Sequence, residues 1–279
     1  MSPSADAATY VLGHSEHEVR RLQVQAELID PITRRIFHRA GVKSGMRVLD
    51  LGSGAGDVAF LAAEIVGPSG TVVGIDRSST AISVAGKRAA EQSLAHVSFV
   101  EGDLLRPPVD GRFDAIVGRY VLQFQRDPAE CLRALQHLLA PGGVLAFHEI
   151  DWGGLSSFPA APVFQRCSAL GAETLRGHGT EAAMGRGLYA AFVRAGLGEP
   201  TLHLEAPVAG GASAAPWLRM FADLVRTLEP EMTRLGVAAR GELAVDTLAD
   251  RLVQEAIDLG AVIIGHYQVG AWVKAGAPK

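Results

Sequence analysis

The stretch Val48–Asp57, VLDLGSGAGD, decides the fold. It reads as a short apolar strand, a glycine-rich turn and the start of a helix. Glycines let the backbone turn tightly and approach a ligand closely, and the first turn of the following helix offers unpaired N–H groups. Taken alone, such a turn fits either a dinucleotide-binding dehydrogenase or a simple structural connection.

Short apolar runs alternate with amphipathic stretches on both sides of this turn. Helices are expected from Asp57 and from Ser79, and strand alternating with helix is typical of a parallel sheet with right-handed crossovers. The sequence therefore predicts an α/β fold with a doubly wound, seven-stranded Rossmann-like sheet. Its strands are expected at 48–51, 71–75, 97–100, 113–117, 144–150, 201–204 and 266–274.

The helix after the fourth strand has the clearest boundaries. Asp127 is its expected N-cap, Pro128 occupies its first turn, and Glu130 completes a capping box. The sequence Pro141-Gly142-Gly143 is expected to end it, so that the fifth strand begins at Val144.

Two carboxylates mark the ends of successive strands. Asp76 ends the second strand about 20 residues after the glycines, where an acidic side chain can accept hydrogen bonds from ribose hydroxyls. Asp103 ends the third strand, where a carboxylate can receive an adenine amino group. Either aspartate by itself could be a cap or a solvated residue, but both at consecutive strand ends favour a single nucleoside site.

With these residues in place, the sequence resembles the class I S-adenosylmethionine-dependent methyltransferases, especially bacterial small-molecule enzymes. The resemblance covers about residues 45–151 and, weakly, Gly270–Trp272. It implies S-adenosylmethionine as cofactor and S-adenosylhomocysteine as product. A dehydrogenase is the second hypothesis. It is less favoured because such enzymes usually space their glycines GxGxxG and have no pair of carboxylates equivalent to Asp50 and Asp103.

The resemblance also implies roles for individual residues. Asp50, or the backbone near it, would hold the amino group of the cofactor, while Asp76 would bind the ribose and Asp103 the adenine. The other cofactor-binding residues implied are Gly52, Ser53, Gly54, Gly56, Arg77, Leu104 and Arg119, with Tyr10 and Gln25 from an amino-terminal arm covering the cofactor.

Catalysis could be mostly positioning, because a sulfonium methyl group needs no electrophilic activation. A general base, if one is used, should project from the carboxyl end of the fourth or fifth strand or from a cap. The candidates are Asp151, His148, Glu149, Tyr120 and His178. His148 and Glu149 alternate along a strand, so at most one of them points to a given face, and the other should pair with a helix or backbone.

The chain is expected to be divided into an arm, a core and a cap. Residues 1–44 form the helical arm, with a helix at 15–40 that Pro31 breaks. The core comprises 45–206 and 264–279, with a first insertion at 152–183. Residues 207–263 are expected to form a helical cap for the acceptor, entered by a flexible link at 210–213.

Composition narrows the partners. Lys and Arg total 26 against 30 Asp and Glu, a net charge of −4, which gives no electrostatic footprint for nucleic acid or anionic lipid. His203 and His266 lack an identifiable third metal ligand, so no metal is expected. The amino-terminal sequence lacks a signal-peptide pattern, which favours a cytoplasmic protein without membrane association. A homodimer is an open alternative.

These observations predict transfer of a methyl group to oxygen, nitrogen or carbon of a small, partly apolar, secondary-metabolite-like acceptor. Two alternatives stay open. One is a cofactor-retaining, non-methylating enzyme or binder on the same fold, and the other is a protein or tRNA methyltransferase.

Overall fold

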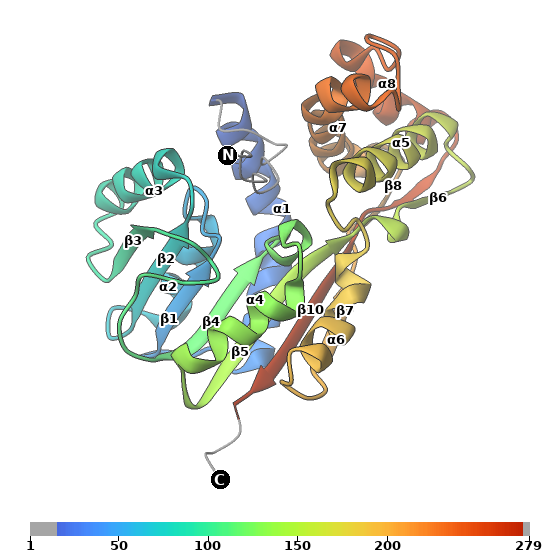
Figure 1. The fold of residues 1–279 in the computed structure, drawn as a ribbon. Helices are drawn as coiled ribbons and strands as arrows, with labels where there is room; N and C mark the ends of the chain where they lie inside the picture. The colour runs from blue at the N-terminus through green and yellow to red at the C-terminus, as the bar shows by residue number, and fades with distance from the viewer. Residues whose placement is uncertain (1–15, 276–279) are drawn as a thin grey trace, which may run out of the picture. The chain divides into compact units, whose positions relative to one another are not determined.

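A seven-stranded sheet is the larger of the two sheets in the computed structural model, which describes residues 16–275 (Figure 1). The pairings of β1 with β2 and β4, of β2 with β3, and of β4 with β5 are all parallel, whereas β10 and β7 are antiparallel. The doubly wound seven-stranded sheet expected from the sequence is thereby confirmed. The strands, in their order across the sheet, are β3 (Val97–Glu101), β2 (Thr71–Asp76), β1 (Arg47–Leu51), β4 (Phe113–Arg119), β5 (Leu139–Asp151), β10 (Tyr267–Lys274) and β7 (Thr201–Glu205).

Helices cover both faces of this sheet. On one face, α1 (Glu16–Ala40), α2 (Asp57–Val66) and α3 (Ser79–Glu91) share a buried cluster with alternate residues of the strands. On the other face lie α4 (Pro128–Leu135) and α6 (Met184–Arg194), and Phe192 of α6 makes an edge-to-face contact with Phe147 of β5. Figure 1 shows α4 and α6 in front of the sheet and α1 behind it.

Helix α1 continues through Pro31 instead of breaking there. A proline inside a helix removes one hydrogen bond and crowds the preceding turn. Here the turns that follow Pro31 bury Ile32, Ile36 and Phe37 against the sheet. Tertiary burial offsets the local cost, as it commonly does for amphipathic helices.

The fifth strand starts earlier than expected. Helix α4 ends at Leu135, a 3-10 turn η2 (Gln136–Leu138) follows, and β5 already begins at Leu139, so Pro141–Gly143 lies inside the strand. The cap prediction for α4 agrees with the structure, since Asp127 accepts a hydrogen bond from the Ala129 N–H at 3.0 Å.

The described chain separates into two compact units. Within the expected arm, residues 16–25 belong to one unit and the residues from Ala26 to the other, because the apolar residues of α1 after this point pack on the sheet. The sheet unit comprises 26–150, 184–205 and 268–275, and the helical unit comprises 16–25, 151–183 and 206–267. Both expected insertions thus fall in one unit.

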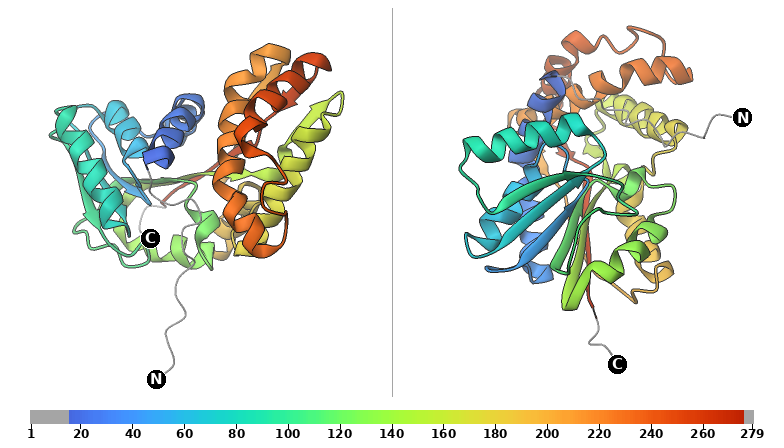
Figure 2. Two further views of the ribbon diagram at one scale, coloured as in Figure 1. Left: turned by 90° about the horizontal axis from the view of Figure 1, so that it is seen from above. Right: turned by 60° about the vertical axis from the view of Figure 1, so that its left-hand side comes forward.

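The helical unit has its own core. Helices α5 (Pro162–His178), α7 (Ala215–Leu235) and α8 (Val245–Asp258) pack together, as the two views of Figure 2 show. Rings pack in the middle of this core, including a stacked pair, Trp217 and Phe221, with centroids 5.3 Å apart. Trp152, Phe164 and His266 complete the cluster, so most of the apolar face of α7 is used for packing.

A small antiparallel sheet in this unit was not expected. It joins β6 (Ser156–Phe158), β9 (Val262–Ile264) and β8 (Val208–Gly210). Residues 210–213 end β8 and enter a 3-10 turn, η4 (Gly211–Ala214), so they are part of ordered elements and not a flexible link. Within residues 16–275, no helix combines the length and apolar character needed to cross a bilayer.

Candidate functional site

The site lies at the carboxyl ends of the parallel strands. Strand β1 is flanked by β2 on one side and β4 on the other. The strand order reverses here, with β2 and β3 following on one side of β1 and β4 and β5 on the other. Such a topological switch point is where open α/β sheets bind ligands. The parallel register places Leu51 beside Ile75, next to Asp76, and the glycine-rich turn starts at this edge.

The turn after β1 has a backbone that only glycine adopts easily. Gly52, Gly54 and Gly56 have φ angles of +66°, +51° and +96°. A Cβ atom at Gly52 would come within 2.7 Å of the Val121 side chain, and one at Gly56 within 2.9 Å of the rings of Phe60 and Phe99. Around Gly54, in contrast, a Cβ would meet no atom within 4 Å, which leaves an open space above the turn.

Asp76 holds this turn in place. One carboxylate oxygen accepts a hydrogen bond from the Gly54 N–H at 2.9 Å, and the other accepts one from the Ser78 N–H at 2.9 Å. An ionised carboxylate has about four lone-pair directions, so each oxygen can still accept a further donor. Asp76 therefore holds the turn and keeps acceptor capacity for further donors.

Asp50 is one of the unsatisfied buried groups of the site, with the Ser53 hydroxyl and Oε2 of Glu149. Its side chain is fully buried, and neither carboxylate oxygen has a hydrogen-bond partner among the described residues. Burial raises the pKa of Asp50 well above its ordinary value, and the positive charge of Arg119 opposes this shift without cancelling it. A buried carboxylate in this state calls for a cationic donor.

We expect Asp50→Asn to increase the free energy of unfolding of the ligand-free protein at about pH 8, by on the order of 1 kcal/mol. A carboxyl group with a raised folded pKa stabilises the protein at low pH, and this contribution is lost as the pH rises through the folded pKa. Asparagine carries no such charge. Urea unfolding of both proteins at about pH 5 and about pH 8 measures the effect; a difference that is equal at both pH values would contradict it.

The end of β3 carries the second predicted carboxylate. Asp103 is exposed, and it accepts a hydrogen bond from the Leu105 N–H at 3.0 Å, which orders the turn that follows. Leu104 is buried at the same place, as a wall residue would be. Arg77, one residue after β2, is exposed.

Arg119, at the end of β4, is held by helix α1. Its guanidinium donates to Asp30 at 2.6 Å and to the Thr33 hydroxyl at 3.0 Å, and its side chain is only 6% exposed. The Thr33 hydroxyl in turn lies 3.0 Å from Nδ1 of His148. A buried polar network therefore fixes α1 against the ends of β4 and β5.

His148 and Tyr120 belong to the same network. His148 Nε2 lies 2.9 Å from the Gln268 side-chain oxygen, which also accepts a hydrogen bond from the Tyr120 hydroxyl. Burial lowers the pKa of His148 to about 3, so the imidazole is neutral at physiological pH. Burial also raises the pKa of Tyr120. Tyr120 has a φ of +57°, a conformation that non-glycine residues adopt only when their surroundings hold it.

Glu149 points to the other side of β5, as the alternation of the strand requires. It is fully buried and one of its oxygens accepts two backbone hydrogen bonds, from Val121 and Leu122. The prediction that one of the two neighbours pairs with backbone agrees with this arrangement.

The remaining catalytic candidates lie in the helical unit. Asp151 is buried and accepts a hydrogen bond from the Gly153 N–H at 2.8 Å, capping the turn η3 (Trp152–Gly154). His178, at the end of α5, lies 2.9 Å from the Glu231 carboxylate of α7. The structure thus places both in polar contacts within this unit.

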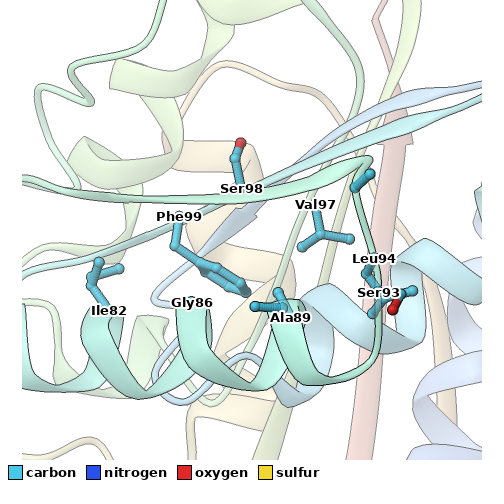
Figure 3. Close-up of a pocket in the computed structure, with 10 residues that line it drawn as sticks. Ile82, Gly86, Ala89, Ser93, Leu94, Val97, Ser98 and Phe99 are labelled. Carbon is cyan, nitrogen blue, oxygen red and sulfur yellow. The ribbon is translucent and has the colours of Figure 1, made fainter.

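Two of the predicted cofactor-binding side chains are not described by the structure. Tyr10 lies outside the described residues, and so does the side chain of Gln25. Among residues 16–275 there is no group of three or more metal-ligating side chains. A pocket of about 640 Å³ between α3 and β3, lined by residues such as Ile82, Ala89 and Phe99, contains none of the predicted site residues (Figure 3).

Sequence reasoning did not identify several residues that build the site. Arg88 of α3 donates to the Ala55 carbonyl at 2.6 Å and pairs with Asp57 at 2.8 Å, bracing the glycine-rich turn. Asp30, Thr33 and Gln268 anchor the network around Arg119 and His148. No local pattern singles them out, because their partners lie 31 to 120 residues away in sequence.

Comparisons with known proteins agree with this geometry. Residues 42–180 match the family model described as a methyltransferase domain. The 2-phytyl-1,4-naphthoquinone methyltransferase of Synechococcus elongatus is 46% identical over 105 residues, which cover 37% of this chain and 45% of that protein. The demethylmenaquinone methyltransferase of Lactococcus lactis is 31% identical over 137 residues, covering 49% of this chain and 52% of that protein.

This chain therefore spans about half the length of the curated relatives that it matches. Over a longer stretch, the [4+2]-cyclase SpnF has the same fold, with a TM-score of 0.52 and 20% identity, covering 89% of this chain and 82% of that one.

The residues present fit S-adenosylmethionine. Its ammonium group would supply the donor that the buried carboxylate of Asp50 lacks among the described residues, and its ribose hydroxyls would match the free acceptor capacity of Asp76. The space above Gly54 is open for the ligand. The predicted cofactor and the predicted methyltransferase domain are confirmed by the family match. Through residues 42–180, the chain belongs to the class I S-adenosylmethionine-dependent methyltransferases.

Proposed function

We propose that this chain transfers a methyl group from S-adenosylmethionine to a small, partly apolar acceptor of the reduced naphthoquinone type. The observation that carries the cofactor half is the buried carboxylate of Asp50 beside a turn held by Asp76. Two relatives named as quinone methyltransferases support the acceptor class. The net charge of −4 fits a small acceptor better than the polyanionic tRNA.

The proposed division of labour is simple. Asp50 would bind the ammonium group of the cofactor, Asp76 its ribose, and Asp103 its adenine. S-adenosylmethionine, when bound, supplies the electrophilic methyl group. The chain itself has to orient the acceptor in line with that group and exclude water, since effective alignment accounts for a large part of such rate enhancements.

Two of the five candidate bases are better described as positioning residues. His148 is neutral and held between Thr33 and Gln268, and Glu149 is bound to backbone amides. Tyr120 keeps its proton because its pKa is raised. If the acceptor loses a proton during transfer, Asp151 and His178 remain the candidates to receive it.

The fold alone does not separate methyl transfer from a reaction in which the cofactor is kept, because one fold serves several chemistries. The structural similarity to a [4+2]-cyclase illustrates the point. The fate of the cofactor distinguishes the two: methyl transfer releases S-adenosylhomocysteine in a one-to-one ratio with product, whereas a retained cofactor stays intact over many turnovers.

We expect the protein to convert S-adenosylmethionine to S-adenosylhomocysteine when a reduced naphthoquinone is present. Mass spectrometry of both products, with a phenol and an aliphatic amine as parallel acceptors, measures the ratio and the methylated compound. Methylation of the phenol or amine alone would overturn the quinone-type acceptor. Turnover of an acceptor without S-adenosylhomocysteine, or no turnover with a bound cofactor, would overturn methyl transfer.

A further inference from the structure

We infer that Glu149 is a positioning residue for the cofactor site. It holds the turn after β4 against Gly52, the first glycine of the turn after β1. The inference rests on the proposed function, because it concerns the binding of the same cofactor. It assigns to Glu149 a role distinct from that of a general base.

One carboxylate oxygen of Glu149 accepts hydrogen bonds from two consecutive backbone amides. Its Oε1 accepts hydrogen bonds from the Val121 N–H at 2.9 Å and the Leu122 N–H at 2.7 Å. These amides open the 3-10 helix η1 (Leu122–Phe124), whose N-cap residue, Val121, offers no side-chain cap. The carboxylate takes the place of that cap and fixes the backbone at this point.

The backbone fixed in this way touches the glycine-rich turn directly. A Cβ atom at Gly52 would lie 2.7 Å and 3.2 Å from the two methyl groups of Val121, so the Val121 side chain packs on the bare backbone of Gly52. Tyr120, the residue before, has a φ of +57° and is held by its N–H bond to the His148 carbonyl at 2.9 Å. A displacement of Val121 therefore moves the side chain that packs against Gly52 and so disturbs the glycine-rich turn.

The charge of Glu149 gives this arrangement a pH dependence. Burial raises the pKa of Glu149 to about 7, while the amides of Leu122 and Val121 lower it, and its Oε2 has no partner among the described residues. The other titratable groups that face it are Tyr120 and Cys131 of α4, and burial raises the pKa of both, so they stay neutral. Protonation of Glu149 weakens its two hydrogen bonds, because a charged acceptor binds an amide more strongly than a neutral one.

Stability and cofactor binding should respond to pH in opposite directions. A carboxyl group with a raised folded pKa stabilises the folded protein below its unfolded pKa, and this contribution is lost as the pH rises through about 7. Binding of the cofactor, which needs the ordered turn, should instead improve as Glu149 ionises. A residue with a merely structural role would move both quantities in the same direction.

The test is calorimetric binding of S-adenosylhomocysteine at about pH 6 and about pH 8, with wild type, Glu149→Gln and a matched control, Glu255→Gln. Glu255 also binds two backbone amides, those of Val163 and Phe164 at 2.9 and 3.1 Å, but it does so at the start of α5. We expect Glu149→Gln to bind about tenfold more weakly at about pH 8. Its affinity should lose the part of the wild-type pH dependence that Glu149 causes, since Asp50 is present in all three proteins. Glu255→Gln should bind as wild type does.

Wild-type affinity for Glu149→Gln, or equal weakening in Glu255→Gln, would overturn the inference. If Glu149→Gln does not fold, the pH series of Asp50→Asn decides, because an ionising Asp50 would itself raise affinity and lower stability as the pH rises. In Asp50→Asn, affinity that still rises between about pH 6 and about pH 8 while stability falls supports the inference, and any other pattern overturns it. Wild-type protein that binds no S-adenosylhomocysteine at either pH would overturn the proposed function itself, which is a distinguishable result.

Discussion

Replacing Asp76 with alanine is expected to weaken binding of S-adenosylhomocysteine by about a hundredfold. The carboxylate holds the turn through the Gly54 N–H and has acceptor capacity left for two ribose hydroxyls. Its removal leaves the amide and both hydroxyls without a charged partner. Calorimetry with purified wild-type and variant protein measures the loss.

A matched control is available at the opposite end of the sheet. Asp114 accepts a hydrogen bond from the Arg47 N–H at 2.8 Å, where β1 begins. Asp114→Ala therefore also removes a carboxylate that holds a strand end, but far along β1 from the glycine-rich turn. Unchanged affinity in the Asp76 variant, or an equal loss in the Asp114 variant, would refute the assignment of Asp76.

Replacing Gly56 with alanine is expected to lower the free energy of unfolding by about 3 kcal/mol. Part of this cost is the φ of +96°, which an L side chain disfavours. The larger part is steric, because the new Cβ would lie 2.9 Å from atoms of the Phe60 and Phe99 rings, which pack edge to face with centroids 5.8 Å apart. Urea unfolding of both proteins provides the measurement.

Gly196→Ala separates the two contributions. Gly196 has a φ of +77°, but a Cβ there would meet no atom within 4 Å. Only the backbone cost of about 1 kcal/mol should appear. If the two variants lose the same stability, the packing of the two rings against Gly56 is not what makes this glycine necessary.

Much of the cofactor half of the site could be predicted from the sequence because its signals are local. The strand, turn and helix at Val48–Asp57 follow from short apolar runs and glycine spacing, and Asp76 and Asp103 are found by their place after successive strands. Parallel pairing then brings these strand ends to one edge of the sheet, as a general consequence of the topology. The sequence alone was therefore sufficient for the sheet and for placing Asp76 and Asp103 after successive strands of it.

Other features depend on the tertiary structure. The pairing of Arg119 with Asp30 and of His148 with Gln268 joins residues 89 and 120 positions apart, and no periodicity encodes such contacts. The three-residue strands β6, β8 and β9 are too short to show alternation.

Glu149 combines a feature that the sequence predicts with one that only the tertiary structure shows. Its alternation with His148 predicts that the two side chains point to opposite faces of β5. Only the folded chain shows that the carboxylate meets the amides of Val121 and Leu122, because a side chain's partner depends on which distant backbone the fold brings to it. The sequence by itself determined the seven-stranded sheet, the glycine-rich turn and the opposite directions of His148 and Glu149. The tertiary structure decided which polar groups are satisfied and which, such as Asp50, have no hydrogen-bond partner among the described residues, since hydrogen bonding and burial are properties of the assembled core.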